Sequence, residues 1–244
     1  MIKSLGKFLI GVVSLTAIYS SNVAAAPIYE FEVNNPANNP AGGKITNIKT
    51  RYDSDNQTFS WQSTTEKANG QYTDGFWLVV SDGPDPKGHV NEYAIMYGDL
   101  ATGTLTSYIY NGNSTYNTWR HNQNYIASTG ANFINVSDNG TARTFNFELD
   151  TTQINSLFTT TDWDGVAFGE KIGIWYHPSI GSTFAYNADG SLKNFSVTQS
   201  GWYDAAHQTT TPISTPATIS LFLMSVALVP FIRNRRRSFK TATA

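Results

Sequence analysis

Apolar and polar side chains alternate along much of the middle of this chain, and this period of two is the feature that most restricts its fold. Residues 144–149 read Thr-Phe-Asn-Phe-Glu-Leu, and residues 48–52 and 59–62 repeat the alternation. Because successive side chains of a strand point to opposite faces of a sheet, each segment predicts a strand with one buried face. The turn cluster Asp53-Ser54-Asp55-Asn56 separates the last two segments, so residues 44–63 are predicted to form a β-hairpin.

Continuous apolar segments predict a second kind of strand. Residues 76–80, 93–97 and 172–176 are apolar almost throughout, which is typical of central strands covered on both faces. Shorter segments separated by Gly, Asn and Asp turns bring the total to roughly ten strands. Only residues 151–158, preceded by Asp150 as an N-cap, are predicted to be helical. The expected fold class is therefore all-β, an antiparallel β-sandwich or jelly-roll-like domain over residues 26–204.

The first 25 residues have the three parts of a secretory signal peptide. Lys3 and Lys7 supply a positive start, residues 8–18 form a short apolar stretch, and small or polar residues follow. Cleavage is expected after Ala25. The apolar stretch is shorter than the ~20 residues that a membrane-spanning helix needs, so residues 1–25 are interpreted as an export signal and not as an anchor.

The other end of the chain contains an uncharged apolar run over residues 217–232. As a helix it would be about 24 Å long, against a hydrocarbon core of ~30 Å, and flanking side chains can extend it. A basic stop follows the run and consists of Arg233, Arg235, Arg236 and Arg237. The positive-inside rule then predicts a transmembrane helix over 217–232 with a basic cytoplasmic tail over 233–244. Residues 205–216, rich in Thr and Ala, are expected to be a polar linker.

The last thirty residues resemble the PEP-CTERM sorting signal. Pro216, Ala217 and Thr218 match its motif, and the apolar run and arginines follow in the same order; Ile213 and Ser214 stand where the usual form has Val and Pro. The resemblance implies an exosortase-type processing enzyme as a partner, in a Gram-negative cell with an exopolysaccharide system. It also implies initial anchoring in the inner membrane, with release to the cell surface or extracellular matrix after processing.

The body of the chain resembles uncharacterised domains that often precede such tails. The segments that carry this similarity are residues 74–84, 92–95 and 168–177. The resemblance implies no particular activity.

Charge and composition exclude several classes of function. Two of the 16 Lys and Arg residues lie in the signal and five follow residue 232, which leaves nine against all 18 acidic residues, a net charge of −9 for the body. Phosphate binding needs clustered Lys and Arg, so nucleic acid is not an expected partner. The chain has no cysteine, which excludes zinc–thiolate sites and cysteine nucleophiles.

Two acidic loops raise the question of calcium, for which an acidic surface is suited. The loop at residues 53–57 has oxygen ligands at alternate positions but lacks the glycine at its sixth position and the distal Glu of an EF-hand loop. A hairpin turn is the preferred interpretation, and the same holds for the acidic loop at residues 162–165. Calcium binding thus stays an open alternative, but no residues are assigned as a metal site, and no other cofactor is predicted.

Aromatic residues give the best candidate for a binding site. Tyr110, Tyr116 and Trp119 surround the polar segment 111–113, where flat rings could stack on sugars while Asn side chains bind hydroxyl groups. The alternative is that the rings fill the core, which is the preferred interpretation for the tryptophans in strand patterns, Trp61, Trp77 and Trp175. For Tyr116 and Trp119 both interpretations stand.

A catalytic function would need a different set of residues. Glycoside hydrolysis uses two carboxylates about 5–10 Å apart, and the available ones are Glu66, Asp74, Glu92, Glu148, Asp164 and Glu170. No spacing singles out a pair, and no Gly-x-Ser-x-Gly motif is present. The expected function is a non-catalytic, exopolysaccharide-associated surface protein. The alternatives are a polysaccharide-processing glycoside hydrolase and a purely structural surface protein.

Overall fold

The computed structural model describes residues 26–83, 88–114, 116–163 and 165–213. The predicted signal peptide, sorting motif, apolar run and basic tail all lie outside these ranges, as does Asp164. Within the ranges, no helix is both long enough and apolar enough to cross a membrane.

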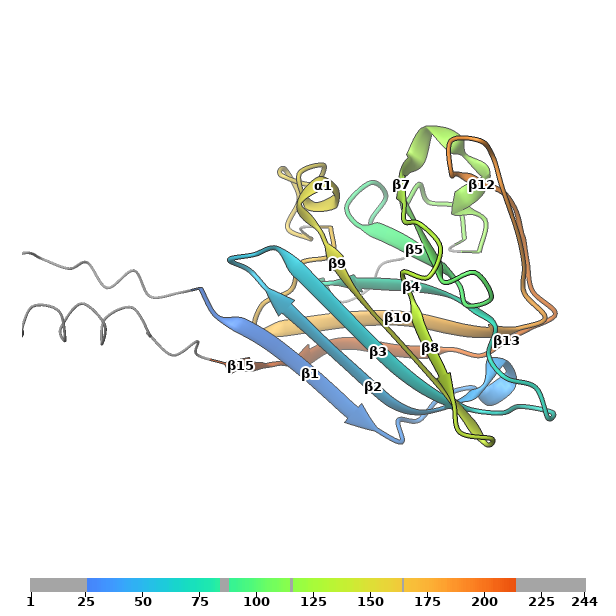
Figure 1. Cartoon of the computed structure of the whole chain (residues 1–244). Coiled ribbons are helices and arrows are strands. Elements are labelled where there is room, and N and C mark those ends of the chain that lie inside the picture. Colours follow the sequence, from blue (N-terminus) through green and yellow to red (C-terminus); the bar gives the residue numbers. More distant parts are fainter. Residues whose placement is uncertain (1–25, 84–87, 115, 164, 214–244) are drawn as a thin grey trace, which may run out of the picture. The chain divides into compact units, whose positions relative to one another are not determined.

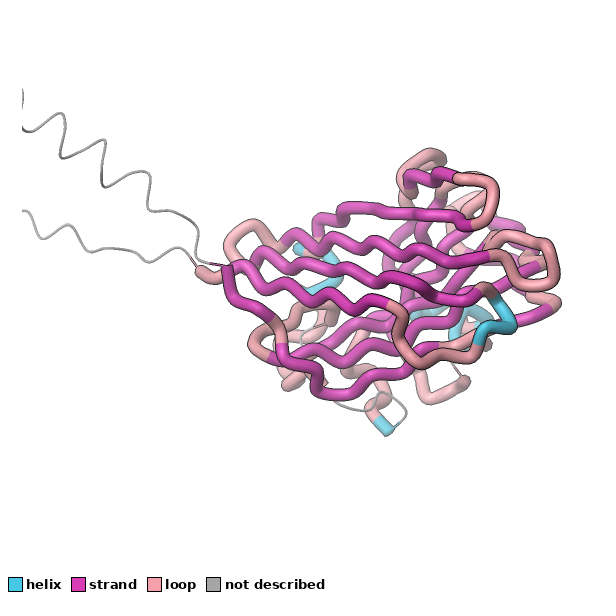
Figure 2. The backbone as a smooth tube through the Cα atoms, turned by 90° about the horizontal axis from the view of Figure 1, so that it is seen from below, coloured by secondary structure: helices cyan, strands magenta, loops and turns pink. Residues whose placement is uncertain are grey.

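Two antiparallel sheets form most of the described domain (Figures 1 and 2). The six-stranded sheet has the order β15 (Thr211–Ile213), β1 (Ile28–Asn34), β2 (Lys44–Asp53), β3 (Thr58–Glu66), β9 (Ala142–Asp150) and β8 (Asn135–Asp138). The seven-stranded sheet has the order β13 (Gln199–Ser200), β10 (Lys171–Ile180), β4 (Gly75–Ser81), β5 (Ala94–Asp99), β6 (Thr104–Ile109) and β7 (Tyr125–Ser128), and β14 (Tyr203–Thr209) also pairs with β10. A separate hairpin consists of β11 (Thr183–Tyr186) and β12 (Leu192–Ser196).

The two large sheets pack face to face through aromatic side chains. Phe76 of β4 stacks on Phe145 of β9 with ring centroids 5.3 Å apart. Trp61 of β3 meets Tyr176 of β10 edge to face at 5.1 Å. Such ring pairs add to the free energy gained by burying their area. The all-β class and the antiparallel sandwich expected from the sequence are confirmed.

The hairpin expected at residues 44–63 is formed by β2 and β3. Its turn is held by Asp53, whose carboxylate accepts hydrogen bonds from the backbone and side-chain amides of Asn56 at 3.1 and 3.0 Å. Gln57 completes the turn with a positive φ of 47°. Of the oxygens that resembled calcium ligands in the sequence, those of Asp53 hold the turn, whereas the Asp55 carboxylate accepts a hydrogen bond from the backbone amide of Ala26 at 2.9 Å.

A second aromatic cluster covers the outer face of the seven-stranded sheet. The hairpin β11–β12 and the loop that contains the short helices η3 (Thr118–Arg120) and η4 (Asn122–Asn124) contribute to it. Phe195 of β12 packs against Trp77 at 6.1 Å and against Tyr97 at 5.3 Å between ring centroids. Central strands β4 and β5 are thus covered on both faces, which confirms the interpretation of their continuous apolar sequences.

The structure differs from the sequence prediction at the expected linker. Residues 205–209 belong to β14 and residues 211–213 to β15, so the described part of the segment 205–216 is mostly strand. Both strands lie against neighbours through backbone pairing, β14 with β10 and β15 with β1. Because such pairing needs no apolar side chains, a Thr- and Ala-rich sequence gives little sign of it.

The helix predicted over residues 151–158 is only one turn long. It is α1 (Thr152–Asn155), with Thr151 at its N-cap position. Asp150, predicted as the N-cap, lies one residue before that position, and its carboxylate accepts a hydrogen bond from the backbone amide of Thr152 at 2.9 Å.

Candidate functional site

The aromatic residues expected to form an open sugar platform are mostly buried. Tyr110 is 3% exposed and Trp119 is 7% exposed. Tyr110 stacks on Tyr93 with centroids 4.9 Å apart, and the partly buried Tyr116 packs against Trp77 at 5.8 Å. The alternative that the rings fill the core therefore describes Tyr110 and Trp119, whereas Tyr116 is only partly buried. The physical reason is that the polar loop folds back over the outer face of the seven-stranded sheet and is covered by β12.

One edge of this region still borders the surface. Trp119 and Leu192 form apolar walls of a hollow of about 530 Å³, which we call the Trp119 hollow. Its remaining lining is polar and comes from Arg120, Asn122, Gln123, Asn187 and Lys193. The β12 side is fixed because the backbone amide of Leu192 donates to the Tyr108 hydroxyl at 2.6 Å. Burial raises the pKa of Tyr108 to about 12, so this hydroxyl stays protonated at neutral pH.

A second surface lies on the outer face of the six-stranded sheet, where polar residues alternate with the core residues. A hollow of about 400 Å³ there is lined by residues of five strands, β1, β2, β3, β9 and β8. The strand registers place Glu30, Arg51, Ser60 and Glu148 in one row. Lys49, Gln62, Asn146 and Asn135 form the adjacent row. We call this surface the outer-sheet groove.

Arg51 lies near the centre of the outer-sheet groove. A smaller hollow of about 170 Å³ shares Arg51, Ser60 and Glu148 with the first and continues the groove towards the β2–β3 turn. The Nε atom of Arg51 is buried and has no hydrogen-bond partner within the described part of the chain. A buried donor without a partner costs about 1–3 kcal/mol, so a bound acceptor at this point would be stabilised.

Acidic side chains flank the arginine. Burial raises the pKa of Asp53, but hydrogen bonds from Asn56 and the charge of Arg51 outweigh it and lower that pKa below its ordinary value. Glu148 accepts a hydrogen bond from the Ser60 hydroxyl at 3.2 Å. The groove thus combines both charges with neutral amides, an arrangement that offers both donors and acceptors across five strands.

Three of the carboxylates considered for glycoside hydrolysis have structural contacts. Glu66 pairs with Lys44 at 3.2 Å, and Glu92 pairs with His89. Asp74 accepts hydrogen bonds from the backbone amides of Gly181 and Ser182. These contacts hold strands and corners in place.

The outer-sheet groove itself contains two carboxylates, Glu30 and Glu148, in one row. Three strand spacings separate them, since Arg51 and Ser60 lie between. At about 4.8 Å per strand the two backbones are roughly 14 Å apart, whereas hydrolysis places the carboxyl groups about 5–10 Å apart. Glu30 and Glu148 are therefore spaced more widely than a catalytic pair of carboxylates.

Metal binding has no obvious location in the described ranges. No group of three or more His, Asp or Glu side chains there is placed to hold an ion.

The sequence contained part of the signal for both surfaces. The outward positions of the predicted hairpin, including Lys49, Arg51 and Gln62, could be read from the alternation, but β1 and β9 could not be assigned as its neighbours. The Trp119 hollow joins residues more than sixty positions apart, from Trp119 to Asn187, so no local pattern reveals it. Comparison of the chain with models of protein families, with curated proteins and with solved structures finds no match.

Proposed function

We propose that this protein is exported and held at the cell surface or in the extracellular matrix, where its jelly-roll-like sandwich binds polysaccharide without cleaving it. The observation that carries the binding function is the outer-sheet groove, with its hydrogen-bonding side chains from five adjacent strands. The resemblance of residues 213–237 to a PEP-CTERM signal supports export, inner-membrane insertion and an exosortase-type partner.

The chemistry of the groove favours a ligand rich in hydroxyl groups. Gln62, Asn135 and Asn146 each carry both donors and acceptors, and Arg51 and Glu148 add a charged donor and a charged acceptor. Sugar hydroxyls both donate and accept, so they match such a mixed surface. The wide opening across the strands suits a segment of a polymer better than a small apolar molecule, which would need a concave apolar pocket.

Substitution of the central arginine tests this function. Arg51→Gln should weaken the binding of a polysaccharide found by glycan-array screening by about tenfold, the equivalent of one charge-assisted hydrogen bond. Lys44→Gln is the matched control, because this substitution also removes one positive charge from β2. Lys44 does not line the groove. Calorimetric titration of the full-length protein gives both affinities.

Three outcomes of that experiment distinguish the candidate functions. Equal affinities for Arg51→Gln and Lys44→Gln would move the binding site elsewhere. Release of reducing sugar, abolished by Glu148→Gln, would favour the hydrolase. The absence of binding to any glycan would favour a structural surface protein.

Location is tested separately. We expect the full-length chain to fractionate with the inner membrane and to lose mass at residues 216–218 only in cells that contain an exosortase. A cytoplasmic product would contradict export, and an identical intact mass in both strains would contradict processing.

A further inference from the structure

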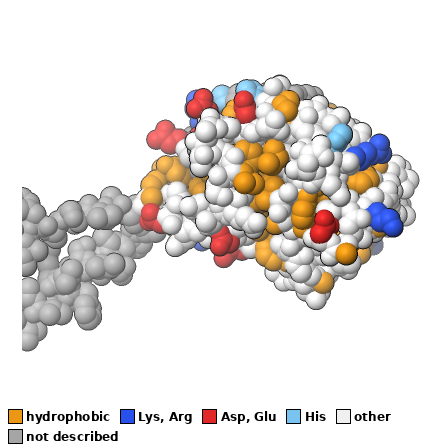
Figure 3. Space-filling model, turned by 90° about the horizontal axis from the view of Figure 1, so that it is seen from above, with side chains coloured by type: hydrophobic (Ala, Val, Ile, Leu, Met, Phe, Trp, Pro, Cys, Tyr) orange, Lys and Arg blue, Asp and Glu red, His pale blue; other side chains and the backbone are white. Residues whose placement is uncertain are grey.

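Positive charge is scarce on this domain, and two of its basic residues line the same hollow. Arg120 comes from η3 and Lys193 from β12, and both line the Trp119 hollow. Neither forms an ion pair with any described residue, whereas Lys44 and Arg143 are paired with Glu66 and Asp138. Figure 3 shows the basic side chains visible from above mainly at the right of the view and most of the acidic ones at the left.

The walls of the Trp119 hollow are held in position by contacts within the domain. The Arg120 guanidinium lies 5.6 Å from the centre of the Trp119 ring, a cation–π distance. On the opposite side, the Asn187 side-chain amide donates to the Ser191 hydroxyl at 2.9 Å. Trp119, Leu192 and Asn187 are thus fixed by packing and hydrogen bonds, whereas Arg120 and Lys193 are exposed at the rim of the hollow.

The acidic residue of the same turn is already engaged. Asp189 accepts hydrogen bonds from the hydroxyl and the backbone amide of Ser191 at 2.6 and 2.9 Å. These bonds hold the pKa of Asp189 below its ordinary value. Its carboxylate therefore stays ionised in the turn and makes no ion pair with Lys193 or Arg120.

These features define the ligand chemically. Two cations favour an anionic group, and the guanidinium can bind a carboxylate through two hydrogen bonds. The amides of Asn122, Gln123 and Asn187 match hydroxyl groups, and the edge of Trp119 offers an apolar contact. The hollow of about 530 Å³ is wide open to solvent, so it suits one unit of a longer chain and not a small molecule that must be enclosed.

We propose that the Trp119 hollow binds a carboxylate-bearing sugar, a uronate unit of an acidic polysaccharide. The class of ligand rests on the proposed polysaccharide-binding function, but the site shares no lining residue with the outer-sheet groove. Denser polyanions are disfavoured because the body carries a net charge of −9, which repels a chain with a charge on every phosphate. One carboxylate per sugar is a weaker charge that two cations can neutralise.

The test compares three probes on the purified full-length protein by calorimetry: an oligogalacturonate, a neutral cello-oligosaccharide of equal length, and inorganic polyphosphate. We expect the oligogalacturonate to bind most tightly and its affinity to fall with added salt. Arg120→Gln and Lys193→Gln should each weaken it by roughly tenfold. Arg120→Lys should restore part of the affinity, since the charge returns without the planar fork.

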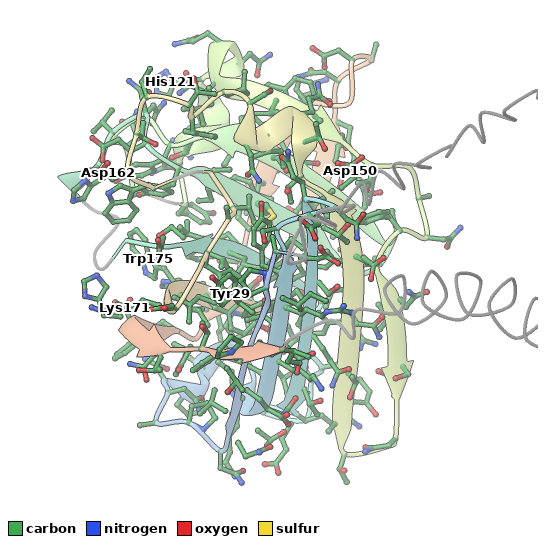
Figure 4. The ribbon with its side chains drawn as sticks, turned by 90° about the vertical axis from the view of Figure 1, so that its left-hand side faces the viewer. Tyr29, His121, Asp150, Asp162, Lys171 and Trp175 are labelled. Atoms are coloured by element: carbon green, nitrogen blue, oxygen red, sulfur yellow. The ribbon has the colours of Figure 1, made fainter. Side chains whose placement is uncertain are left out.

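Lys171→Gln is the control for the loss of one surface charge. Lys171 is exposed, makes no ion pair with any described residue, and does not line the hollow. Figure 4 shows it well apart from His121, the neighbour of Arg120 in sequence. We expect the affinity of Lys171→Gln for oligogalacturonate to equal that of the unmodified protein.

Three results would overturn the inference. The first is an unchanged affinity for oligogalacturonate in the double variant Arg120→Gln and Lys193→Gln, with a melting temperature that shows the variant to be folded. The second is equal affinity for the neutral oligosaccharide, and the third is tighter binding of polyphosphate. Loss of oligogalacturonate binding in Arg51→Gln, with no effect of the Arg120 and Lys193 substitutions, would contradict this site while supporting the proposed function of the outer-sheet groove.

Discussion

Trp119 shows how far the burial of a single residue can depart from its local sequence. It lies among Asn, Thr and Arg residues, yet it is 7% exposed and belongs to the same aromatic cluster as Trp77. We expect Trp119→Ala to lower the free energy of unfolding by about 3–5 kcal/mol, as for Trp77→Ala, because both leave a cavity in a packed cluster. Chemical denaturation monitored by circular dichroism measures the loss.

Trp202 provides the matched control for that prediction. Its side chain is 47% exposed, so Trp202→Ala should change the free energy of unfolding by no more than about 0.5 kcal/mol. If Trp119→Ala behaved like Trp202→Ala, the loop would not be packed as the structure has it, and an exposed sugar platform would again be reasonable.

The residues that could be assigned from the sequence are those within regular strands. Trp61, Trp77 and Trp175 occupy strand patterns and are buried as predicted. Trp119 could not be assigned because its burial depends on β12, which lies more than seventy residues later in the chain. For the same reason, the sequence could not indicate that Lys193 and Arg120 line one hollow.

At the scale of elements, the segment after residue 203 gives the sharpest test. β14 pairs with β10 over residues 203–209, although the composition of this segment resembles a linker. We expect hydrogen–deuterium exchange of its paired amides to be slowed by at least tenfold relative to an unstructured peptide, because exchange requires local opening. Exchange at the unstructured rate would restore the linker interpretation.

Elements with side-chain signals were predicted well, and elements stabilised by backbone pairing were not. The β2–β3 hairpin has both alternation and a turn cluster, and its strands were located correctly. β14 has only Tyr203 buried, and its last four residues are exposed. An edge strand of this kind is stabilised by hydrogen bonds of its main chain. Such bonds form with almost any side chains, so the sequence gives little indication of the strand.

For the whole molecule, acidic groups determine how stability depends on pH. A hydrogen bond from Arg143 lowers the pKa of Asp138, and the two side chains are joined by two bonds of 2.8 Å. Since the pKa of an unfolded Asp is about 3.9, this contribution is fully present above that pH. It is lost as pH falls through the lowered folded-state pKa.

We therefore expect the melting temperature to be nearly constant from neutral pH down to about pH 5 and to fall below about pH 4. The melting temperature of Asp138→Asn should be lower at pH 7 but should fall less on acidification, because the asparagine amide cannot take up the proton that Asp138 binds. Thermal melts of both proteins between these pH values measure the difference. A gap between the two melting temperatures that persists unchanged below pH 3 would show that the ion pair is not responsible.

The pairing of the first strand with the last has a mechanical consequence. Ile28 at the start of β1 lies opposite Ile213 at the end of β15, and only three residue pairs join the two strands. If the chain is held through its carboxyl-terminal end, tension on residue 213 directed away from β1 loads these pairs one after another instead of shearing the whole sheet. β15 would peel away first, while seven residue pairs still join β1 to β2. The strand would act as a short extensible tether, lengthening under load while the outer-sheet groove and the Trp119 hollow keep their shape.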